Sequence, residues 1–220
     1  MRDLNQLLLN FEYKQNFKDE DFYVSKSNYF AFNLIDSWPK WEKNFLNISG
    51  DKFSGKSHLA NIFLKKFKGI KIDANTFKNE KLHEIKVHEN IILENFDQNI
   101  DEVLIYSLFN LIDNDNKYLI INSINPINEM DFKLNDLKSR AKNCLFAVIE
   151  KPDDELMFAL ILKNFSDRQI TIDKKLIDFI IKRIDRSYSK IFEFIYKIDE
   201  FSLKKKKPID FKTIKEVLKA

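Results

Sequence analysis

Five short apolar runs alternate with segments of helical periodicity between residues 45 and 149. Continuous apolar runs are typical of strands that are buried on both faces, and their alternation with helices favours a parallel sheet. The predicted strands are Phe45–Ile48, Ile70–Ile72, Ile91–Leu93, Tyr118–Ile121 and Leu145–Ile149. The predicted helices are Ser25–Trp38, Lys56–Phe67, Glu102–Ile112 and Leu134–Arg140. The pattern predicts an α/β fold with a doubly wound, five-stranded parallel sheet.

The pattern changes after Pro152, where amphipathic helices follow one another with no strand between them. These predicted helices are Asp153–Asn164, Lys174–Ile184, Ser187–Phe201 and Asp210–Leu218. Asp153 and Asp173 precede two of them and suit N-caps. We therefore expect a nucleotide-binding base domain over residues 21–150 and a small C-terminal helical lid domain over residues 151–220.

The most specific motif is a G-x-x-x-x-G-K-S phosphate loop between a predicted strand and the helix that follows it. The chain has only three glycines, and two of them lie in this loop. In such a loop, backbone N–H groups and the helix N-terminus hold phosphate. The predicted nucleotide-binding residues are Gly50, Asp51, Lys52, Phe53, Ser54, Gly55, Lys56 and Ser57. Lys56 would contact the β- and γ-phosphates, and the Ser57 hydroxyl would bind Mg²⁺.

Polar residues follow two other predicted strands, at the edge where a doubly wound sheet binds its ligand. Glu94 directly follows Ile91–Leu93 and is the predicted second ligand of Mg²⁺. The next residue is Asn95, and a neutral amide cannot act as a general base. The site is therefore expected to bind nucleotide and to hydrolyse it poorly. Asn122 follows Tyr118–Ile121, where it either points at the γ-phosphate or only caps the strand end.

Composition narrows the class of protein without identifying it. The 220 residues carry a net charge of +3, which is too small to demand a nucleic-acid partner. No stretch approaches the ~18 apolar residues of a membrane span, and the N-terminus lacks the apolar region of a signal peptide, so we expect a cytoplasmic protein. The one cysteine, Cys144, suits a small buried side chain in a strand. The run Lys204–Lys207 suits an anion contact or, more simply, a solvated loop.

Longer motifs resemble the DnaA branch of the AAA+ ATPases, and within it the Hda-type regulators of replication initiation. They extend over nearly the whole chain and are Asp21–Asn28, Ser37–Trp41, Gly55–Ala60, Leu108–Asn110 and Asp136–Arg140. The G-K-S-H-L sequence that begins at Gly55 is far more specific than the phosphate loop alone. The resemblance implies an AAA+ module with ADP or ATP and Mg²⁺ as ligands.

The resemblance also assigns roles to particular residues. Those that would join the phosphate loop around the nucleotide are Val24, Asn28 and His58. Arg140 would be an arginine finger, which in this family completes the nucleotide site of a neighbouring protein in trans. Residues 1–20 would form a flexible tail that binds the DNA polymerase sliding clamp, through a peptide similar to the Q-L-x-L-x-F of Hda-type proteins. Its predicted clamp-binding residues are Gln6, Leu7, Leu9 and Phe11.

The chain departs from the family pattern at places that bear on hydrolysis. Phe53 replaces a glycine that is frequent in the loop, and Asn95 replaces the second acid. Asn122 would serve as one sensor, whereas Ser189 stands where the family carries the sensor arginine. The nearby candidate cations are Arg183, Arg186 and Lys190, and the sequence does not decide between them.

Three functions stay open on this evidence. The first is an Hda-like regulator that binds ADP or ATP, docks on the clamp and promotes hydrolysis of DnaA-bound ATP, which down-regulates initiation. The second is a DnaA-like or loader-like ATPase that acts on DNA, and the third is a recruitment-only adaptor. The predicted tail favours the first over the second, and Arg140 favours it over the third. For the first function, we expect little intrinsic ATPase activity and only indirect or non-specific contact with DNA. We expect no membrane partner. The sequence leaves the oligomeric state open, with a homo-oligomer as one option.

Overall fold

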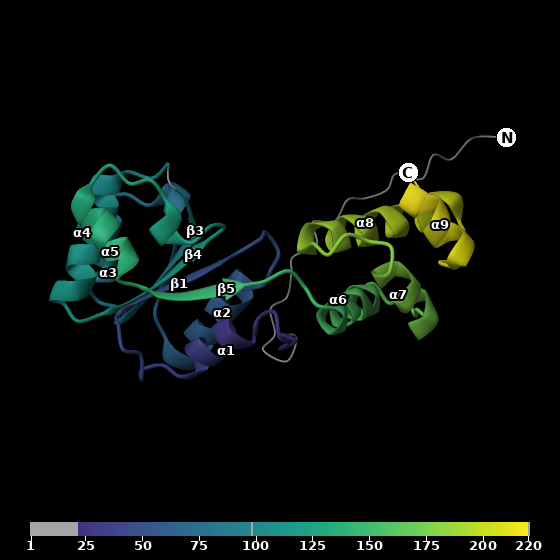
Figure 1. The fold of residues 1–220 in the computed structure, drawn as a ribbon, viewed down its shortest axis with the longest axis horizontal. Coiled ribbons are helices and arrows are strands. Elements are labelled where there is room, and N and C mark those ends of the chain that lie inside the picture. The colour runs from purple at the N-terminus through teal and green to yellow at the C-terminus, as the bar shows by residue number, and fades with distance from the viewer. Residues whose placement is uncertain (1–21, 98, 220) are drawn as a thin grey trace.

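The computed structural model describes residues 22–97 and 99–219, and its centre is a five-stranded sheet (Figure 1). The strands are β1 (Phe45–Gly50), β2 (Ile70–Asp73), β3 (Asn90–Phe96), β4 (Tyr118–Ser123) and β5 (Leu145–Ile149). They lie in the order β2-β3-β4-β1-β5, and every neighbouring pair is parallel. The predicted parallel sheet is confirmed, and the strand that leads into the phosphate loop is an inner strand.

Helices cover both faces of the sheet. One face carries α1 (Tyr29–Asp36) and α2 (Lys56–Phe67), and the other carries α3 (Lys81–Ile85), α4 (Glu102–Asn114) and α5 (Asn135–Lys142). Short 3-10 turns, η2 (Ala74–Thr76) and η3 (Ile127–Glu129), follow β2 and β4. Alternate residues of one strand serve the two apolar cores, because Ile91 and Leu93 face α4 while Ile92 faces α2.

Four further helices lie beyond β5 and are here called the C-terminal helices (Figure 1). They are α6 (Asp154–Asp167), α7 (Lys174–Ile181), α8 (Tyr188–Lys205) and α9 (Phe211–Lys219). Their apolar faces meet in a core of their own, which includes Ile161, Ile177 and Ile195. Asp153 accepts a hydrogen bond from the Leu156 N–H at 2.8 Å, and Asp173 accepts one from the Lys175 N–H at 2.7 Å, so both predicted N-caps are confirmed. A separate lid domain over residues 151–220 stays a prediction.

The first helix is shorter than its apolar pattern predicts. It begins at Tyr29 and not at Ser25, because the Asn28 side chain accepts a hydrogen bond from the Ser25 N–H at 2.8 Å. A second bond, from the Asn28 amide to the Tyr23 carbonyl oxygen at 2.9 Å, continues this turn. Asn and Ser side chains compete with the helix for backbone groups in this way.

Two smaller expectations also change. α8 continues through Lys205 and ends where Lys206 takes a left-handed conformation, so part of the Lys204–Lys207 run is helical and not a loop. Cys144 is buried as expected, but it lies directly before β5 and not within it.

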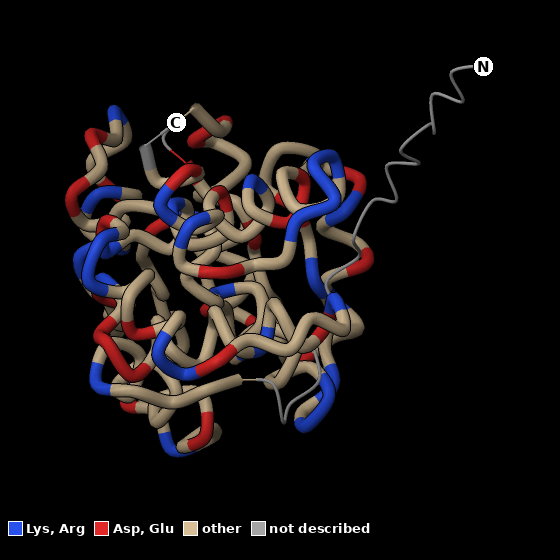
Figure 2. The backbone as a smooth tube through the Cα atoms, turned by 90° about the vertical axis from the view of Figure 1, so that its right-hand side faces the viewer, with Lys and Arg blue, Asp and Glu red and all other residues tan. Residues whose placement is uncertain are grey.

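Charged residues of both signs are spread over the molecule. In the view onto the C-terminal helices, basic and acidic segments of the backbone are interspersed (Figure 2). Within residues 22–97 and 99–219, no helix combines the length and the apolar content that a membrane crossing requires.

Asn47 is a fully buried polar residue in the middle of β1. Its amide donates to the Ile121 carbonyl oxygen and to Ser123 Oγ, both at 2.9 Å, and its Oδ1 accepts from the Ile127 N–H at 3.0 Å. A buried polar side chain is favourable only when its bonds are made. Asn47 therefore ties β1 to the end of β4 and to η3.

Asn47→Ala should lower the free energy of unfolding by about 1–3 kcal/mol, because it leaves the buried Ile127 N–H without a partner. Asn44→Ala is the matched control, since its amide makes one exposed bond, to Asn116 at 3.3 Å, and its loss should stay below about 0.5 kcal/mol. Equilibrium unfolding in urea measures both values. Equal losses in the two variants would contradict the role assigned to Asn47.

Candidate phosphate-binding site

Both glycines of the turn between β1 and α2 adopt backbone conformations that residues with a side chain rarely take. Gly50 has a φ of 154°, and a Cβ there would lie 2.8 Å from the Ile149 carbonyl oxygen. Gly55 has a φ of 98°, and a Cβ there would lie 3.1 Å from the Phe22 ring. Both glycines are needed to wrap the backbone around the N-terminus of α2, where N–H groups bind anions.

Lys56 is the first residue of α2, and its ammonium turns back into the loop. Its Nζ donates to the carbonyl oxygens of Gly50 at 2.6 Å and Asp51 at 2.7 Å. Burial lowers the pKa of Lys56 to about 8, although the charges of Glu94 and Asp51 oppose this shift. A phosphate group would supply the close negative charge that favours the ammonium form.

Ser57 and Glu94 form a second polar pair, across the gap between α2 and β3. Ser57 Oγ donates to Glu94 Oε2 at 2.9 Å. Glu94 is only 7% exposed, and its Oε1 is buried without a hydrogen-bond partner in the described part of the chain. A carboxylate oxygen in this state beside a hydroxyl suits a hard cation such as Mg²⁺. The described residues hold no group of three His, Cys, Asp or Glu that could bind a metal, so phosphate and water would complete the coordination.

Asn122 lies near the end of β4 and is 1% exposed. Neither its Oδ1 nor its Nδ2 has a hydrogen-bond partner among residues 22–97 and 99–219. An unmade bond of this kind costs about 1–3 kcal/mol. Asn122 lines the same cavity as Lys56 and Glu94, so a polar ligand there would satisfy its amide. This environment favours the sensor interpretation over a strand-end cap.

Asn95 departs from regular strand geometry. The pairing of β3 with β4 shifts in register between Leu93 and Phe96, and Asn95 has a φ of 57°. Its amide donates to Asp73 Oδ2, at the end of β2, at 2.7 Å. Asn tolerates the left-handed conformation better than most residues. The side chain that follows Glu94 is therefore held by the neighbouring strand.

These polar groups open into one cavity of about 840 Å³, lined by both the sheet and the C-terminal helices. Small-molecule sites occupy about 300–1,000 Å³. Its apolar lining includes Phe22, Phe53, Leu156, Leu160, Tyr188 and Phe192. Phosphate-binding groups beside an aromatic lining suit a ligand that joins phosphates to a flat ring.

Most of the predicted nucleotide-binding residues line this cavity. Those that do are Asn28, Lys52, Phe53, Ser54, Gly55, Lys56, Ser57 and His58. Gly50 and Asp51 do not, and contribute through the carbonyls that hold Lys56. Val24 is also outside the lining, and its role stays a prediction. The predicted clamp-binding residues Gln6, Leu7, Leu9 and Phe11 lie outside the described residues.

Tyr188 joins the C-terminal helices to the sheet and its covering helices. Its side chain is buried in the core that α1 and α2 share with the sheet, and its hydroxyl donates to the Glu150 carbonyl oxygen at 3.0 Å. Burial raises the pKa of Tyr188 to about 12, so the hydroxyl keeps its proton and stays a donor. The start of α8 is thereby held against the sheet.

The C-terminal helices contribute cavity residues that sequence reasoning missed. The Phe192 ring on α8 lies 5.2 Å from the Phe53 ring, between centroids, and Lys163 of α6 also lines the cavity. Helical periodicity could place Phe192 on an apolar face but could not show what that face meets. Ser189, at the predicted sensor position, does not line the cavity.

The three cations considered as replacements for the sensor arginine are directed elsewhere. Their contacts are Arg183 on the Phe179 ring at 3.6 Å, Arg186 with Asp154 at 2.7 Å and Lys190 with Glu193 at 2.9 Å. None of these three cations lines the cavity. The cation that the C-terminal helices do bring to the cavity is Lys163.

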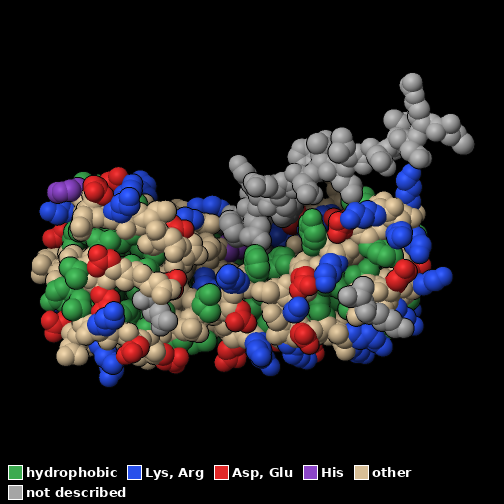
Figure 3. Space-filling model, turned by 90° about the horizontal axis from the view of Figure 1, so that it is seen from above, with side chains coloured by type: hydrophobic (Ala, Val, Ile, Leu, Met, Phe, Trp, Pro, Cys, Tyr) green, Lys and Arg blue, Asp and Glu red, His purple; other side chains and the backbone are tan. Residues whose placement is uncertain are grey.

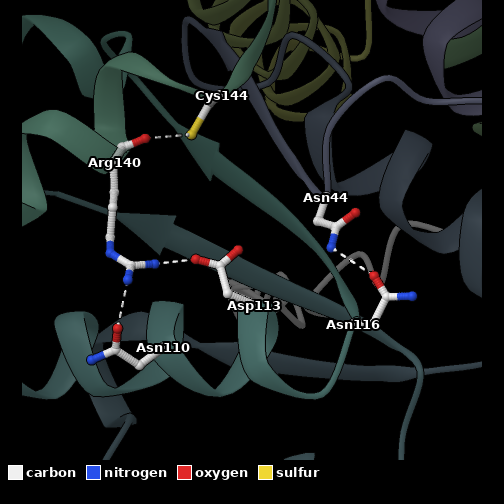
Figure 4. Close-up of polar contacts among 6 residues, drawn as sticks. All are labelled: Asn44, Asn110, Asp113, Asn116, Arg140 and Cys144. Carbon is white, nitrogen blue, oxygen red and sulfur yellow. Dashed lines mark hydrogen bonds and ion pairs between the residues drawn. The ribbon is translucent and has the colours of Figure 1, made fainter.

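Arg140 lies on α5, outside the lining of the cavity. Its guanidinium forms an ion pair with Asp113 and donates to Asn110 Oδ1 at 2.7 Å, both on α4 (Figure 4). The Tyr106 ring lies 5.5 Å from the guanidinium carbon. About 30% of the Arg140 side chain stays exposed, so its charge is accessible from the α4–α5 surface.

In sequence, the chain is similar to DnaA, the chromosomal replication initiator protein. It is 26% identical to DnaA of Thermoanaerobacter sp. over 226 aligned positions, which cover 91% of this chain and 51% of that protein. It is 24% identical to DnaA of Borreliella afzelii, over 94% of this chain and 48% of that protein. The chain thus spans about half the length of the curated relatives it matches. No protein-family model matches it.

Solved structures agree with this likeness. Domain III of the Thermotoga maritima replication initiation protein DnaA has a TM-score of 0.72 at 19% identity, over 92% of this chain and 95% of that one. In sequence and in fold, this chain therefore resembles the DnaA-related AAA+ proteins. The fold is also similar to that of AMPPCP-bound DnaA from Aquifex aeolicus. The TM-score is 0.65 and the identity 20%, over 84% of this chain and 64% of that one. The predicted resemblance to the DnaA branch and the predicted fold are confirmed. The narrower resemblance to Hda-type regulators stays a prediction.

The affinity of this chain for ADP should fall as the pH rises through about 8, because the free Lys56 loses its proton there and phosphate favours the charged form. The phosphate groups titrate near pH about 6 and do not interfere at higher pH. Calorimetry in buffers of different ionisation enthalpy should show proton uptake on binding at pH about 8.5, above the free pKa.

Two variants isolate this effect. Lys56→Ala should lose binding at every pH while the fold persists. Lys56→Arg keeps its charge throughout, so any binding it retains should lose the pH dependence. An affinity of the parent protein that stays flat between pH about 7 and 9.5 would contradict the assignment of Lys56.

Proposed function

We propose that this chain is an Hda-like regulator of replication initiation that binds ADP or ATP with Mg²⁺. The observation that carries the nucleotide part is the cavity lined by Lys56, Glu94 and Asn122. Glu94 and Asn122 have buried polar atoms that form no hydrogen bond with any described residue. DnaA of Aquifex aeolicus, which has a similar fold, was solved with AMPPCP bound, and this supports a nucleotide as the ligand.

Each group at the cavity has a distinct part in binding. Lys56 neutralises phosphate charge, Ser57 and Glu94 would hold Mg²⁺, and the Asn122 amide contacts the terminal phosphate. Bound Mg²⁺ supplies positive charge against the phosphate oxygens. The apolar lining, with Phe22 among its rings, takes the base.

Intrinsic hydrolysis is slow in this proposal. Asn95 has no basic atom to activate water, and its amide is engaged by Asp73. The lid offers Ser189 where a sensor arginine would stabilise charge. Bound nucleotide therefore serves to fix the base and lid in one arrangement.

Arg140 acts on another protein's nucleotide, that of ATP-bound DnaA. Its position outside its own cavity supports action in trans. An ion pair as exposed as that with Asp113 contributes about 0–1 kcal/mol, so the phosphates of a partner can compete for the guanidinium. A guanidinium supplied to the transition state accelerates phosphoryl transfer by about 10³–10⁵ where such fingers have been measured.

Arg140→Ala should therefore keep ADP affinity and lose the stimulation of hydrolysis of DnaA-bound ATP. Arg140→Lys should restore little, because a point charge does not reproduce the planar fork. Lys142→Ala is the control, since it removes an exposed cation from the same helix. The assay measures ADP formed on DnaA in the presence of clamp-loaded DNA. If Arg140→Ala stimulates the hydrolysis of DnaA-bound ATP as well as the parent protein does, the arginine-finger role is wrong and the recruitment-only adaptor becomes the better proposal.

The N-terminal tail brings the regulator to the sliding clamp. Replacing Gln6, Leu7, Leu9 and Phe11 together by Ala should abolish clamp binding and leave the melting temperature nearly unchanged, because a tail adds little to the core. Replacing Asn5 and Asn10 by Ala within the same segment is the control. Surface plasmon resonance on immobilised clamp measures the loss. Undiminished binding by the fourfold variant would remove the tail from the proposal.

A DnaA-like ATPase that acts on DNA is the second candidate, favoured by the curated relatives, which are DnaA proteins. The two candidates differ in what the purified chain does alone. Rapid multiple turnover of ATP without a partner would favour the DnaA-like enzyme over the regulator.

A further inference from the structure

The three last helices, α7, α8 and α9, carry an excess of positive charge that the small net charge of the whole chain conceals. Residues 174–219 hold 14 Lys and Arg against 7 Asp and Glu, while the other residues hold 23 against 27. Charge asymmetry of this kind indicates a surface for a polyanion. Figure 3 shows Lys and Arg side chains, with Asp and Glu among them, at the end of the molecule that α8 and α9 form.

Most acidic side chains of this region are already engaged. The pairs are Glu193 with Lys190 and Lys197, Glu200 with Lys204, Glu216 with Lys207, and Asp199 with Arg168. Asp210 caps α9 through the Thr213 N–H at 2.7 Å. The exposed cations Lys175, Lys182, Arg183 and Lys215 on and beside α7 and α9 form no ion pair within the described part of the chain.

Aromatic rings lie among these cations where α7 meets α9. The guanidinium carbon of Arg183 lies 3.6 Å from the centre of the Phe179 ring, and Lys215 Nζ lies 5.8 Å from it. The Phe211 ring meets Phe179 edge-on at 5.3 Å and is 44% exposed. Helical spacing puts Lys175 and Lys182 on the same side of α7 as Phe179. We name the surface formed by Lys175, Phe179, Lys182, Arg183, Phe211 and Lys215 the α7–α9 patch.

We propose that the α7–α9 patch binds single-stranded nucleic acid without regard to sequence. Sites of this kind combine cations that follow the phosphates with aromatic side chains on which bases stack. In the patch, Lys182, Arg183 and Lys215 would contact phosphates, and Phe211 would present its exposed ring to a base. The site is separate from the nucleotide cavity and does not depend on its occupancy.

Other polyanions fit the patch less well. A helix that lies on a bilayer inserts its apolar face, whereas the apolar faces of α7 and α9 are already buried in the core around Ile177, Ile180 and Ile214. An acidic protein would satisfy the cations but would leave the Phe211 ring without a flat partner. Both are outcomes of the test below.

Fluorescence anisotropy with a labelled oligothymidylate and the full chain measures affinity and its salt dependence. A combined Lys182→Gln, Arg183→Gln and Lys215→Gln variant should bind at least about tenfold more weakly at low salt, with a log–log salt slope shallower by about 2, since each phosphate contact on a single strand contributes about 0.7. The matched control, Lys40→Gln with Lys78→Gln and Lys86→Gln, removes the same charge from exposed positions on the base and should change affinity by less than about twofold.

Phe211→Leu separates stacking from charge. It keeps an apolar side chain against Phe179 and should weaken binding by at least about fivefold with the salt slope unchanged. Unaltered ADP affinity and melting temperature in each variant establish that the fold is intact. A failure of the nucleotide proposal would appear instead in the ADP measurement and leave oligonucleotide binding in place.

Four results would overturn the proposal. One is an equal loss of oligothymidylate affinity in the triple patch variant and in its matched control. Another is an oligothymidylate affinity of Phe211→Leu that equals that of the parent protein. Binding of duplex DNA as tightly as single strands at matched salt would also contradict it. So would tighter binding to phosphatidylserine vesicles or to polyglutamate than to the oligonucleotide.

Discussion

At the carboxyl edge of the sheet, several buried polar atoms form no hydrogen bond with the described residues. Glu94 Oε1 and both polar atoms of Asn122 lack partners among the described residues, and Lys56 is held by two backbone carbonyls. Groups in this state favour any ligand that completes their bonds. The parallel arrangement of β1, β3 and β4 gathers them at one edge, and packed helices on both faces prevent them from turning away. Stability and ligand binding are therefore linked at this edge.

Much of this arrangement could be predicted because it depends on local sequence. Apolar runs identify the strands. Gly50 and Gly55 identify the loop, because its backbone takes conformations at these two positions that favour glycine. The polar residues that follow two of these runs, Glu94 and Asn122, indicate the position of the candidate phosphate-binding site. The register shift around Asn95 could not be predicted, because it arises from the pairing of β3 with β4. The same holds for the Asp73 contact that engages its amide.

The contribution of the C-terminal helices was harder to predict for a different reason. Amphipathic patterns identify an apolar face but not its neighbour, so Phe192 and Lys163 could not be assigned to the cavity. The charge excess of residues 174–219 was present in the sequence but was hidden in the net charge of the whole chain. The structure is needed to tell which cations are already in ion pairs, as along α8, and which cations on α7 and α9 are exposed to a ligand.

The contact between Phe53 and Phe192 has a consequence for how a ligand leaves the cavity. The two rings belong to the phosphate loop and to α8, so a movement of α8 away from the sheet must separate them. Separation exposes aromatic surface to water, and such exposure raises the heat capacity. Ligand exchange that requires this movement should then show a curved temperature dependence. Its rate should also respond to cosolvents that change the hydration of apolar surface.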